Sequence, residues 1–185
     1  MSTYIKIPNE RIGVLVGHDG EVKRMIEEKG DVILRIDSDT GEAEVSPRPD
    51  ADLIRSLRGI NVVKAIGRGF SARRAFRLFD EGEAMYEVID LRQLLGKSRS
   101  QQERVKGRII GKGGKIRALI EELTGTYVSV YGHTIGLIGD PEQIRMSKEA
   151  IFMLIKGCSH RTLLRFLFKK RRELKRRRVM EIWEE

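Results

Sequence analysis

Two short glycine-rich stretches are the parts of this sequence whose residue types and spacing could do chemistry. One is Gly111-Lys112-Gly113-Gly114, and the other is Gly17-His18-Asp19-Gly20. Glycine lets a backbone come close to a phosphate, and a helix that begins after such a loop offers N–H groups and the positive end of its dipole. Both stretches therefore predict phosphate contacts at the start of a helix.

Other kinds of glycine-rich phosphate loop fit the sequence less well. The P-loop pattern requires Ser or Thr after its lysine, but Ile116 follows Lys115. The run from Gly67 to Ala72 has the spacing of a dinucleotide fingerprint, yet it follows a helix-like segment instead of a strand. A plain helix–helix turn stays open as an alternative for Gly111–Gly114, although two copies in the same context make it less favoured.

The charge of the chain indicates a polyanionic partner. Lys and Arg number 36 against 27 acidic residues, a net charge of +9, and residues 158–185 alone hold 10 basic and 4 acidic residues. Such a surplus favours nucleic acid, with an acidic membrane surface as the weaker alternative. Between residues 104 and 117 there are six basic residues and no acid, whereas Asp19 and Glu21 stand at the first loop. Because like charges repel, the second loop is expected to hold a phosphate and the first to do so weakly or not at all.

Several classes of protein are excluded by composition. The single cysteine, Cys158, cannot form an internal disulfide, and three scattered histidines give no metal-ligand spacing. The longest clean apolar run, Ile151–Ile155, is far shorter than a membrane span, and no secretory signal opens the chain. No nucleophile–base pair or convergent carboxylates are evident. We therefore expect a cytoplasmic protein that is not an enzyme and binds no metal, membrane or small-molecule cofactor.

An internal repeat organises the elements around the two loops. Residues 11–36 match residues 105–130 at a shift of 94, with glycines on glycines and apolar positions on apolar positions. Alternating and helical apolar spacing predict the order β-α-loop-α-β-β-α in each copy. Asp140-Pro141 is a helix start, and Asp50 or Asp52 begins the equivalent helix.

The predicted fold is α+β, with two modules that each hold a three-stranded antiparallel sheet and helices on one face. We expect the first module at residues 1–67, a connector at 68–84 that is helical around 72–79, the second module at 85–157 and a basic C-terminal helix at 158–185.

The loop between two helices, preceded by bulky aliphatic residues, resembles the Ile-Gly-x-x-Gly-x-x-Ile pattern of type I KH domains. This resemblance implies an apolar groove that takes about four unpaired bases beside the phosphate-binding loop. The residues expected to bind RNA in the second module are Arg108, Ile109, Ile110, Gly111, Lys112, Gly113, Gly114, Lys115, Ile116, Arg117, Val128 and Val130. A weaker contact is expected at Gly17, His18, Asp19 and Gly20; alternatively the first module packs on the second, binds a protein or uses another face.

Separated motifs extend the likeness over about residues 4–170. The segments 86–92, 107–115 and 144–155, together with Ala65–Phe70, resemble the Dim/Partner-of-Nob group of small-subunit ribosome assembly factors in an archaeal version. The resemblance implies binding of single-stranded rRNA near the 3′ end of the small-subunit RNA. It also implies a partner protein, the endonuclease that trims that end.

The basic C-terminal run has competing interpretations: a further phosphate-binding surface, a solvated helix whose apolar face packs on the modules, or a localisation signal or membrane-surface helix. Its basic residues are Lys169, Lys170, Arg171, Arg172, Lys175, Arg176, Arg177 and Arg178. Two other functions also stay open. One is a protein-interaction adaptor whose modules do not bind RNA, and the other is a general single-strand RNA binder in mRNA turnover.

Overall fold

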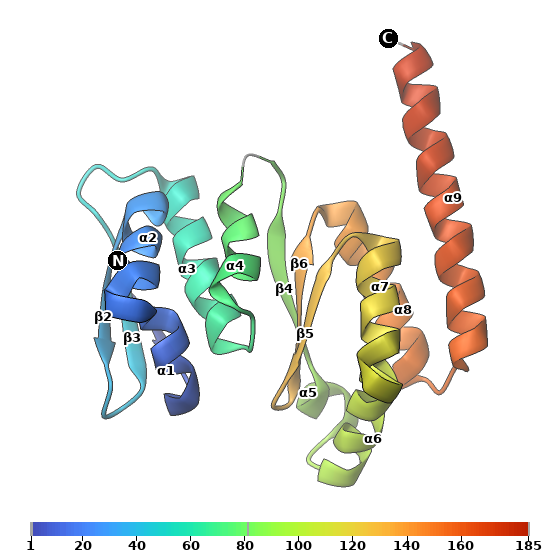
Figure 1. The fold of residues 1–185 in the computed structure, drawn as a ribbon, viewed down its shortest axis with the longest axis horizontal. Helices are drawn as coiled ribbons and strands as arrows, with labels where there is room; N and C mark the ends of the chain where they lie inside the picture. Colours follow the sequence, from blue (N-terminus) through green and yellow to red (C-terminus); the bar gives the residue numbers. More distant parts are fainter. Residues whose placement is uncertain (1, 81, 185) are drawn as a thin grey trace. The chain divides into compact units, whose positions relative to one another are not determined.

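The computed structural model describes residues 2–80 and 82–184, and of residues 178 and 181–184 it describes the backbone alone. The chain folds into short strands and mostly longer helices (Figure 1), with η marking 3₁₀ helices. Their order is β1 (Thr3–Lys6), α1 (Asn9–Val16), η1 (His18–Gly20), α2 (Glu21–Gly30), β2 (Val32–Asp37), β3 (Glu42–Pro47), α3 (Leu53–Gly67), α4 (Ala72–Ala75), η2 (Phe76–Phe79), β4 (Met85–Asp90), α5 (Leu91–Leu95), α6 (Arg99–Ile110), η3 (Lys112–Gly114), α7 (Lys115–Thr124), β5 (Tyr127–Tyr131), β6 (Thr134–Gly139), α8 (Pro141–Ile155) and α9 (His160–Glu184).

The predicted mixture of helices and strands is confirmed. In the described residues the strands form two three-stranded sheets, in the orders β1-β3-β2 and β4-β6-β5. The connector is helical in α4 and η2, as expected, and α9 extends from His160 to Glu184. One element was missed: α5 is a separate short helix that precedes α6, and its N-cap Asp90 accepts a hydrogen bond from the Arg92 amide at 2.8 Å.

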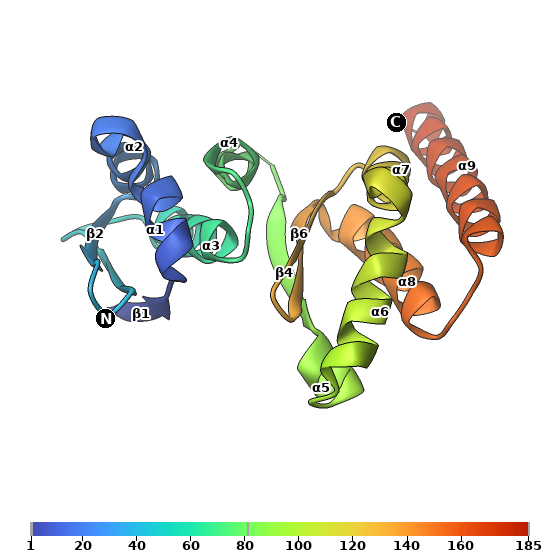
Figure 2. The ribbon, with the colours of Figure 1, turned by 60° about the horizontal axis from the view of Figure 1, so that its bottom comes forward.

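Alternation of side chains decides which face of the first sheet is covered. β3 pairs antiparallel with both neighbours, which places Val45 between Thr3 and Leu34, and Glu44 between Tyr4 and Arg35. Val45 and Leu34 are fully buried, whereas Tyr4 is 62% exposed. The helices α1, α2 and α3 cover the buried face (Figures 1 and 2).

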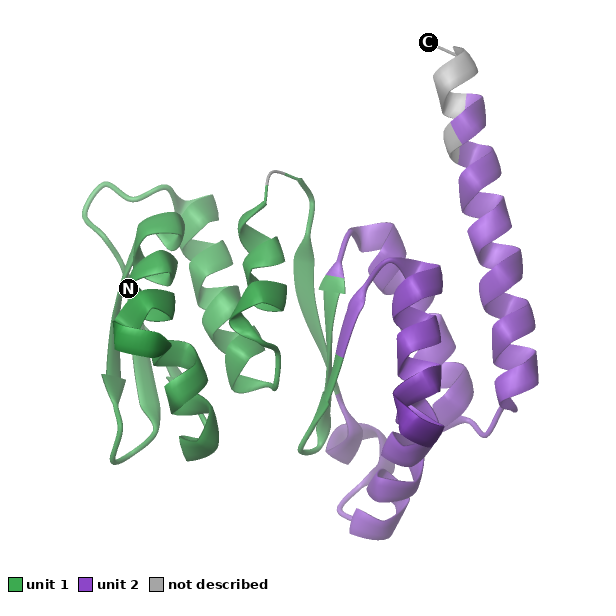
Figure 3. Ribbon diagram, in the orientation of Figure 1, with its two compact units in different colours: residues 1–89, 129–138 green, residues 90–128, 139–185 purple. Residues whose placement is uncertain are grey.

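The chain divides into two compact units (Figure 3). One comprises residues 1–89 and 129–138, and the other comprises residues 90–128 and 139–185. In the first unit, the turn after α3 packs on strands of the second sheet. Phe70 is 1% exposed and meets the Tyr86 ring edge-on, and a Cβ on Gly136 would lie 2.7 Å from the Phe70 ring. A Cβ on Gly69 would lie 2.7 Å from the Ser129 hydroxyl oxygen, so this close contact requires glycine.

The second unit is built from helices that share an apolar core. α9 packs along α7 and α8, and Leu163 and Leu167 of α9 are fully buried there. The hydroxyls of Thr124, Thr126 and Ser147 form a buried cluster in which Thr126 and Ser147 lie 2.7 Å apart. This cluster joins the end of α7 to α8. No described helix combines the length and the apolar character that crossing a membrane requires.

Candidate nucleic-acid interface

The second glycine loop makes a sharp reversal between α6 and α7. Gly111 has φ 71° and ψ 175°, and Gly113 and Gly114 also have positive φ. The Gly111 amide donates to the Gly107 carbonyl at 2.9 Å, which ends α6. A Cβ on Gly111 would lie 2.4 Å from Cγ1 of Ile116 and 3.0 Å from its backbone nitrogen. Only glycine fits this position, because the next helix begins directly against it.

The outer side of the same loop is open. A Cβ on Gly113 or Gly114 would meet no atom within 4 Å. The side chains of Lys112 and Lys115 are exposed beside these glycines. The loop leads into α7, a helix of 10 residues whose first turn points amide groups toward this opening. An anion can therefore approach the backbone between two lysine side chains.

The first loop has the same backbone and the opposite charge. Gly17 has φ 74° and ψ 179°, and a Cβ there would lie 2.5 Å from Cγ2 of Val22. The position of Gly113 is taken by Asp19, which has φ 49° and ψ 27°, a conformation that Asp tolerates better than most residues. Its carboxylate lies 3.1 Å from the His18 ring, with both side chains more than 80% exposed. The backbone of the two loops is alike, but the first carries an exposed carboxylate where the second has a glycine.

The expected groove residues fall into two groups. Ile109 and Val128 are 0% and 1% exposed, so they belong to the core and offer no surface to a base. Ile110 and Val130 are half-buried, and Ile116 is 9% exposed, so these three lie nearer the surface.

The predicted cations of the loop also have different surroundings. Lys112 and Lys115 are exposed, while the Arg108 guanidinium donates to the carbonyl of Cys158. Arg117 is half-buried, and its Nε is buried without a hydrogen-bond partner among the described residues. Spacing along the sequence gave no indication that Arg108 holds the turn between α8 and α9, because its partner is 50 residues away.

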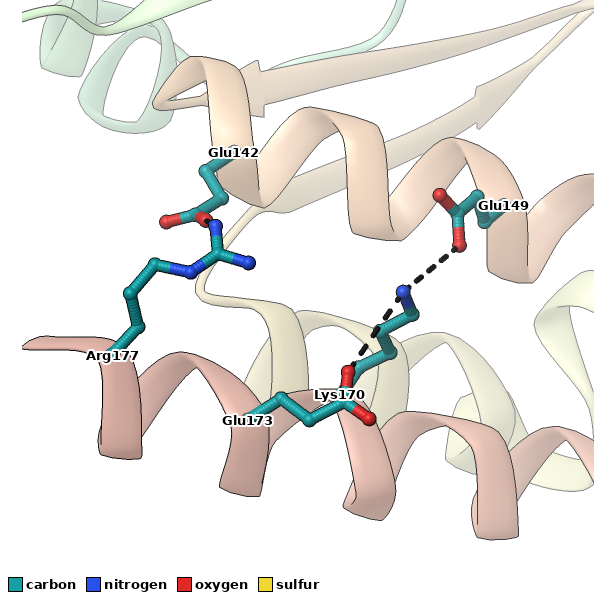
Figure 4. Close-up of polar contacts among 5 residues, drawn as sticks. All are labelled: Glu142, Glu149, Lys170, Glu173 and Arg177. Atoms are coloured by element: carbon teal, nitrogen blue, oxygen red, sulfur yellow. Dashed lines mark hydrogen bonds and ion pairs between the residues drawn. The ribbon is translucent and has the colours of Figure 1, made fainter.

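The basic residues of α9 are distributed over different faces of the helix. Lys170 lies 4.0 Å from Glu149 and 3.9 Å from Glu173, and Arg177 lies 3.1 Å from Glu142 (Figure 4). In contrast, Lys169, Arg172, Lys175 and Arg176 are exposed, and Arg171 is half-buried. The side chain of Arg178 lies outside the described residues.

No cluster suited to a metal ion is found in the part of the chain that the structure describes. There, no group of three or more His, Cys, Asp or Glu side chains could hold an ion.

Comparison with known proteins identifies the fold around the second loop. A family model described as a eukaryotic-type KH domain (KH-domain type I) matches residues 85–172. A KH domain-containing protein of Methanocaldococcus jannaschii is 41% identical over 179 residues, which cover 97% of this chain and 78% of that protein. The pre-rRNA-processing protein PNO1 of Candida glabrata is 32% identical over 129 residues, 68% of this chain and 48% of that protein.

A solved structure extends the likeness to three dimensions. Dim2p of Pyrococcus horikoshii, in a complex with the α subunit of a/eIF2 and rRNA, matches with a TM-score of 0.86 at 40% identity. The match covers 94% of this chain and 95% of that one. These findings confirm the resemblance inferred from the separated motifs. The chain belongs to the KH-domain family of ribosome assembly factors that includes the PNO1 proteins and the archaeal Dim2 proteins.

Proposed function

We propose that this chain binds single-stranded RNA through the Gly111–Gly114 loop and acts, without catalysis, in assembly of the small ribosomal subunit. One observation carries the proposal: two loops share one backbone, but only the second places lysines and open glycines before a helix N-terminus. The names of the relatives support the pathway, since one is a pre-rRNA-processing protein and another was solved with rRNA.

We propose a role for each part of the loop. Backbone amides between Lys112 and Gly114 take a phosphate, and the side chains of Lys112 and Lys115 neutralise its charge. Bases lie against Ile110 and Ile116. Ile109 and Val128 keep that surface in place from the core. Arg108 positions the end of α6, and Arg117 adds positive charge to the first turn of α7.

We further propose which RNA and which protein this chain binds, and how its modules are arranged. The RNA is the 3′ region of small-subunit rRNA, and the endonuclease that trims this end is a protein partner. The chain comprises two tandem KH modules, residues 1–67 and 85–157, joined by the connector and followed by the C-terminal helix. The repeated element order and the equal strand orders of the two sheets support this division. The site of action is the cytoplasm.

Fluorescence anisotropy with a 12-nucleotide strand copying the 3′ end of archaeal small-subunit rRNA tests the proposal. The variant Lys112→Asp/Gly113→Asp is compared with His18→Asp. Asp at position 113 is compatible with the fold, since Asp19 occupies the same backbone conformation in the first loop. Four phosphate contacts predict a log–log salt slope of about −3 for the wild type. Loss of binding in the second-loop variant alone supports the proposal.

A reciprocal change tests whether the difference in charge alone explains the expected difference in RNA affinity between the two loops. The triple variant His18→Lys/Asp19→Gly/Glu21→Lys gives the first loop the residues of the second at matching positions. We expect it to bind RNA more tightly than the wild type and with a steeper salt slope. If the second-loop variant binds as the wild type does, the loop is a structural turn and the adaptor function replaces this one.

A further inference from the structure

The two faces of α9 have different surroundings within the second unit. The inward face holds the buried Leu163 and Leu167, and its cations Lys170 and Arg177 form ion pairs with acidic residues of α8 (Figure 4). These two cations are therefore already matched with carboxylates. They hold the helix in place and are poorly suited to bind a further anion.

The outward face of α9 is a continuous basic stripe. Its successive cations are three or four residues apart, which places them on one side of a helix. This outer stripe consists of Arg161, Arg165, Phe168, Lys169, Arg172 and Arg176, all of them exposed. Among the described residues none of its five cations has an ion pair, and the flanking Glu173 is instead 3.9 Å from Lys170. Phe168, 47% exposed, is a large aromatic ring in the middle of the stripe.

The stripe begins beside the helix that leads into the glycine loop. The His160 ring lies 3.0 Å from the carbonyl oxygen of Arg108, and the Arg108 side chain donates to the carbonyl of Cys158. Arg108 precedes Gly111 by three residues. The start of α9 is thus fixed against the end of α6, and the stripe leads away from that point.

We propose that the outer stripe holds a further part of the same RNA strand that the glycine loop grips, with phosphates on its cations and one base on Phe168. This inference rests on the proposed function and extends its site. Cations four residues apart are separated by about 6 Å along the axis, and the stripe from Arg161 to Arg176 spans about 22 Å. Basic surfaces with an interleaved aromatic ring bind single strands in this way, with little dependence on base sequence.

A membrane surface fits the stripe less well than RNA does. A helix that lies on a bilayer inserts a broad apolar face. The apolar residues Leu163 and Leu167 of α9 are buried against protein instead, and the exposed stripe offers Phe168 as its one large apolar group.

Two double variants of equal charge test the inference. Arg165→Gln/Arg172→Gln removes two cations from the outer stripe, and Lys170→Gln/Arg177→Gln removes two from the inward face of the same helix. Anisotropy is measured over a salt series with the 12-nucleotide strand and with hexamers tiled along it, which suffice for the four nucleotides of a KH groove. Circular dichroism checks that α9 stays helical, and Phe168→Leu tests stacking.

The outer variant should weaken binding of the 12-nucleotide strand at least fivefold and reduce its salt slope by about 1.4, or 0.7 for each lost phosphate contact. The affinity of this variant for the hexamers should stay within twofold of the wild-type value. The affinity of Lys170→Gln/Arg177→Gln, the inner variant, should stay within twofold for the hexamers and for the 12-nucleotide strand. Equal losses in the two variants would show a diffuse effect of net charge and overturn the inference, as would an unchanged outer variant. Failure of the proposed function would give a different result: the variant Lys112→Asp/Gly113→Asp would still bind the hexamers.

Discussion

Replacing Gly111 with alanine should destabilise the second unit far more than the same change at Gly113, two residues away. Gly111 combines a positive φ of 71° with an extended ψ of 175°, a region that residues with a side chain rarely occupy. Its added Cβ would also meet Ile116, at 2.4 Å from Cγ1 and 3.0 Å from the backbone nitrogen. The side-chain atom can rotate away, but the nitrogen moves only if the start of α7 moves.

The expected loss in free energy of unfolding at each position is the sum of a backbone contribution and a steric contribution. At Gly111 the backbone conformation costs about 1–3 kcal/mol and the overpacking about 1–3 kcal/mol, so the free energy of unfolding should fall by about 2–6 kcal/mol. Gly113 has φ 62° and ψ 24°, and nothing lies within 4 Å of its added Cβ. Alanine there should cost only about 1 kcal/mol. Gly17→Ala should repeat the large loss in the first unit, because its Cβ would lie 2.5 Å from Val22.

Urea unfolding followed by circular dichroism measures these losses. Two compact units need not unfold in one step, so native-state hydrogen exchange of α2 and α7 amides assigns each loss to its unit. RNA affinity separates the variants further, since Gly113→Ala places a methyl group at the proposed phosphate site and Gly17→Ala does not. Equal losses of stability for Gly111→Ala and Gly113→Ala would refute the loop geometry described above.

Three further changes test other buried groups. Tyr86→Phe removes a buried hydroxyl that has no partner among the described residues and should stabilise the protein by about 1 kcal/mol in thermal unfolding. Burial raises the pKa of Tyr86, so the folded state keeps the proton, and the wild type should lose stability as the pH rises above about 10 while the variant loses less. Ser147→Ala breaks the hydroxyl cluster with Thr124 and Thr126 and should cost about 1–3 kcal/mol in urea unfolding, with Ser38→Ala, at an exposed turn position, as control. Asp140→Ala removes the capping box of α8 and should cost about 1 kcal/mol by the same measurement.

Local patterns predicted the elements of this chain well, because the signals lie within a few residues of one another. Asp52 and Asp140 begin α3 and α8 as their sequence context indicated. The repeat at a shift of 94 predicted two similar loops. The structure shows φ values of 74° and 71° at Gly17 and Gly111.

Contacts between distant residues could not be predicted in the same way. The stretch Gly69-Phe70 lies in a run with the spacing of a dinucleotide fingerprint, but its glycine allows close packing against Ser129. No pattern in the sequence predicts the hydrogen bond from Arg108 to the Cys158 carbonyl. Likewise, the division of α9 into paired and open cations depends on which residues face α8, and only the folded helix places Arg177 near Glu142.

The two loops share one backbone shape and differ in the charges around it. Gly17 and Gly111 are required because the following helix begins against them, at Val22 and Ile116, and this requirement holds whether or not a ligand is present. Asp19 adopts a left-handed conformation and leaves the loop intact. The glycine pattern alone therefore predicts the turn between two helices. Under the proposed function, RNA binding depends instead on what surrounds that turn, which here means lysines at the second loop and carboxylates at the first.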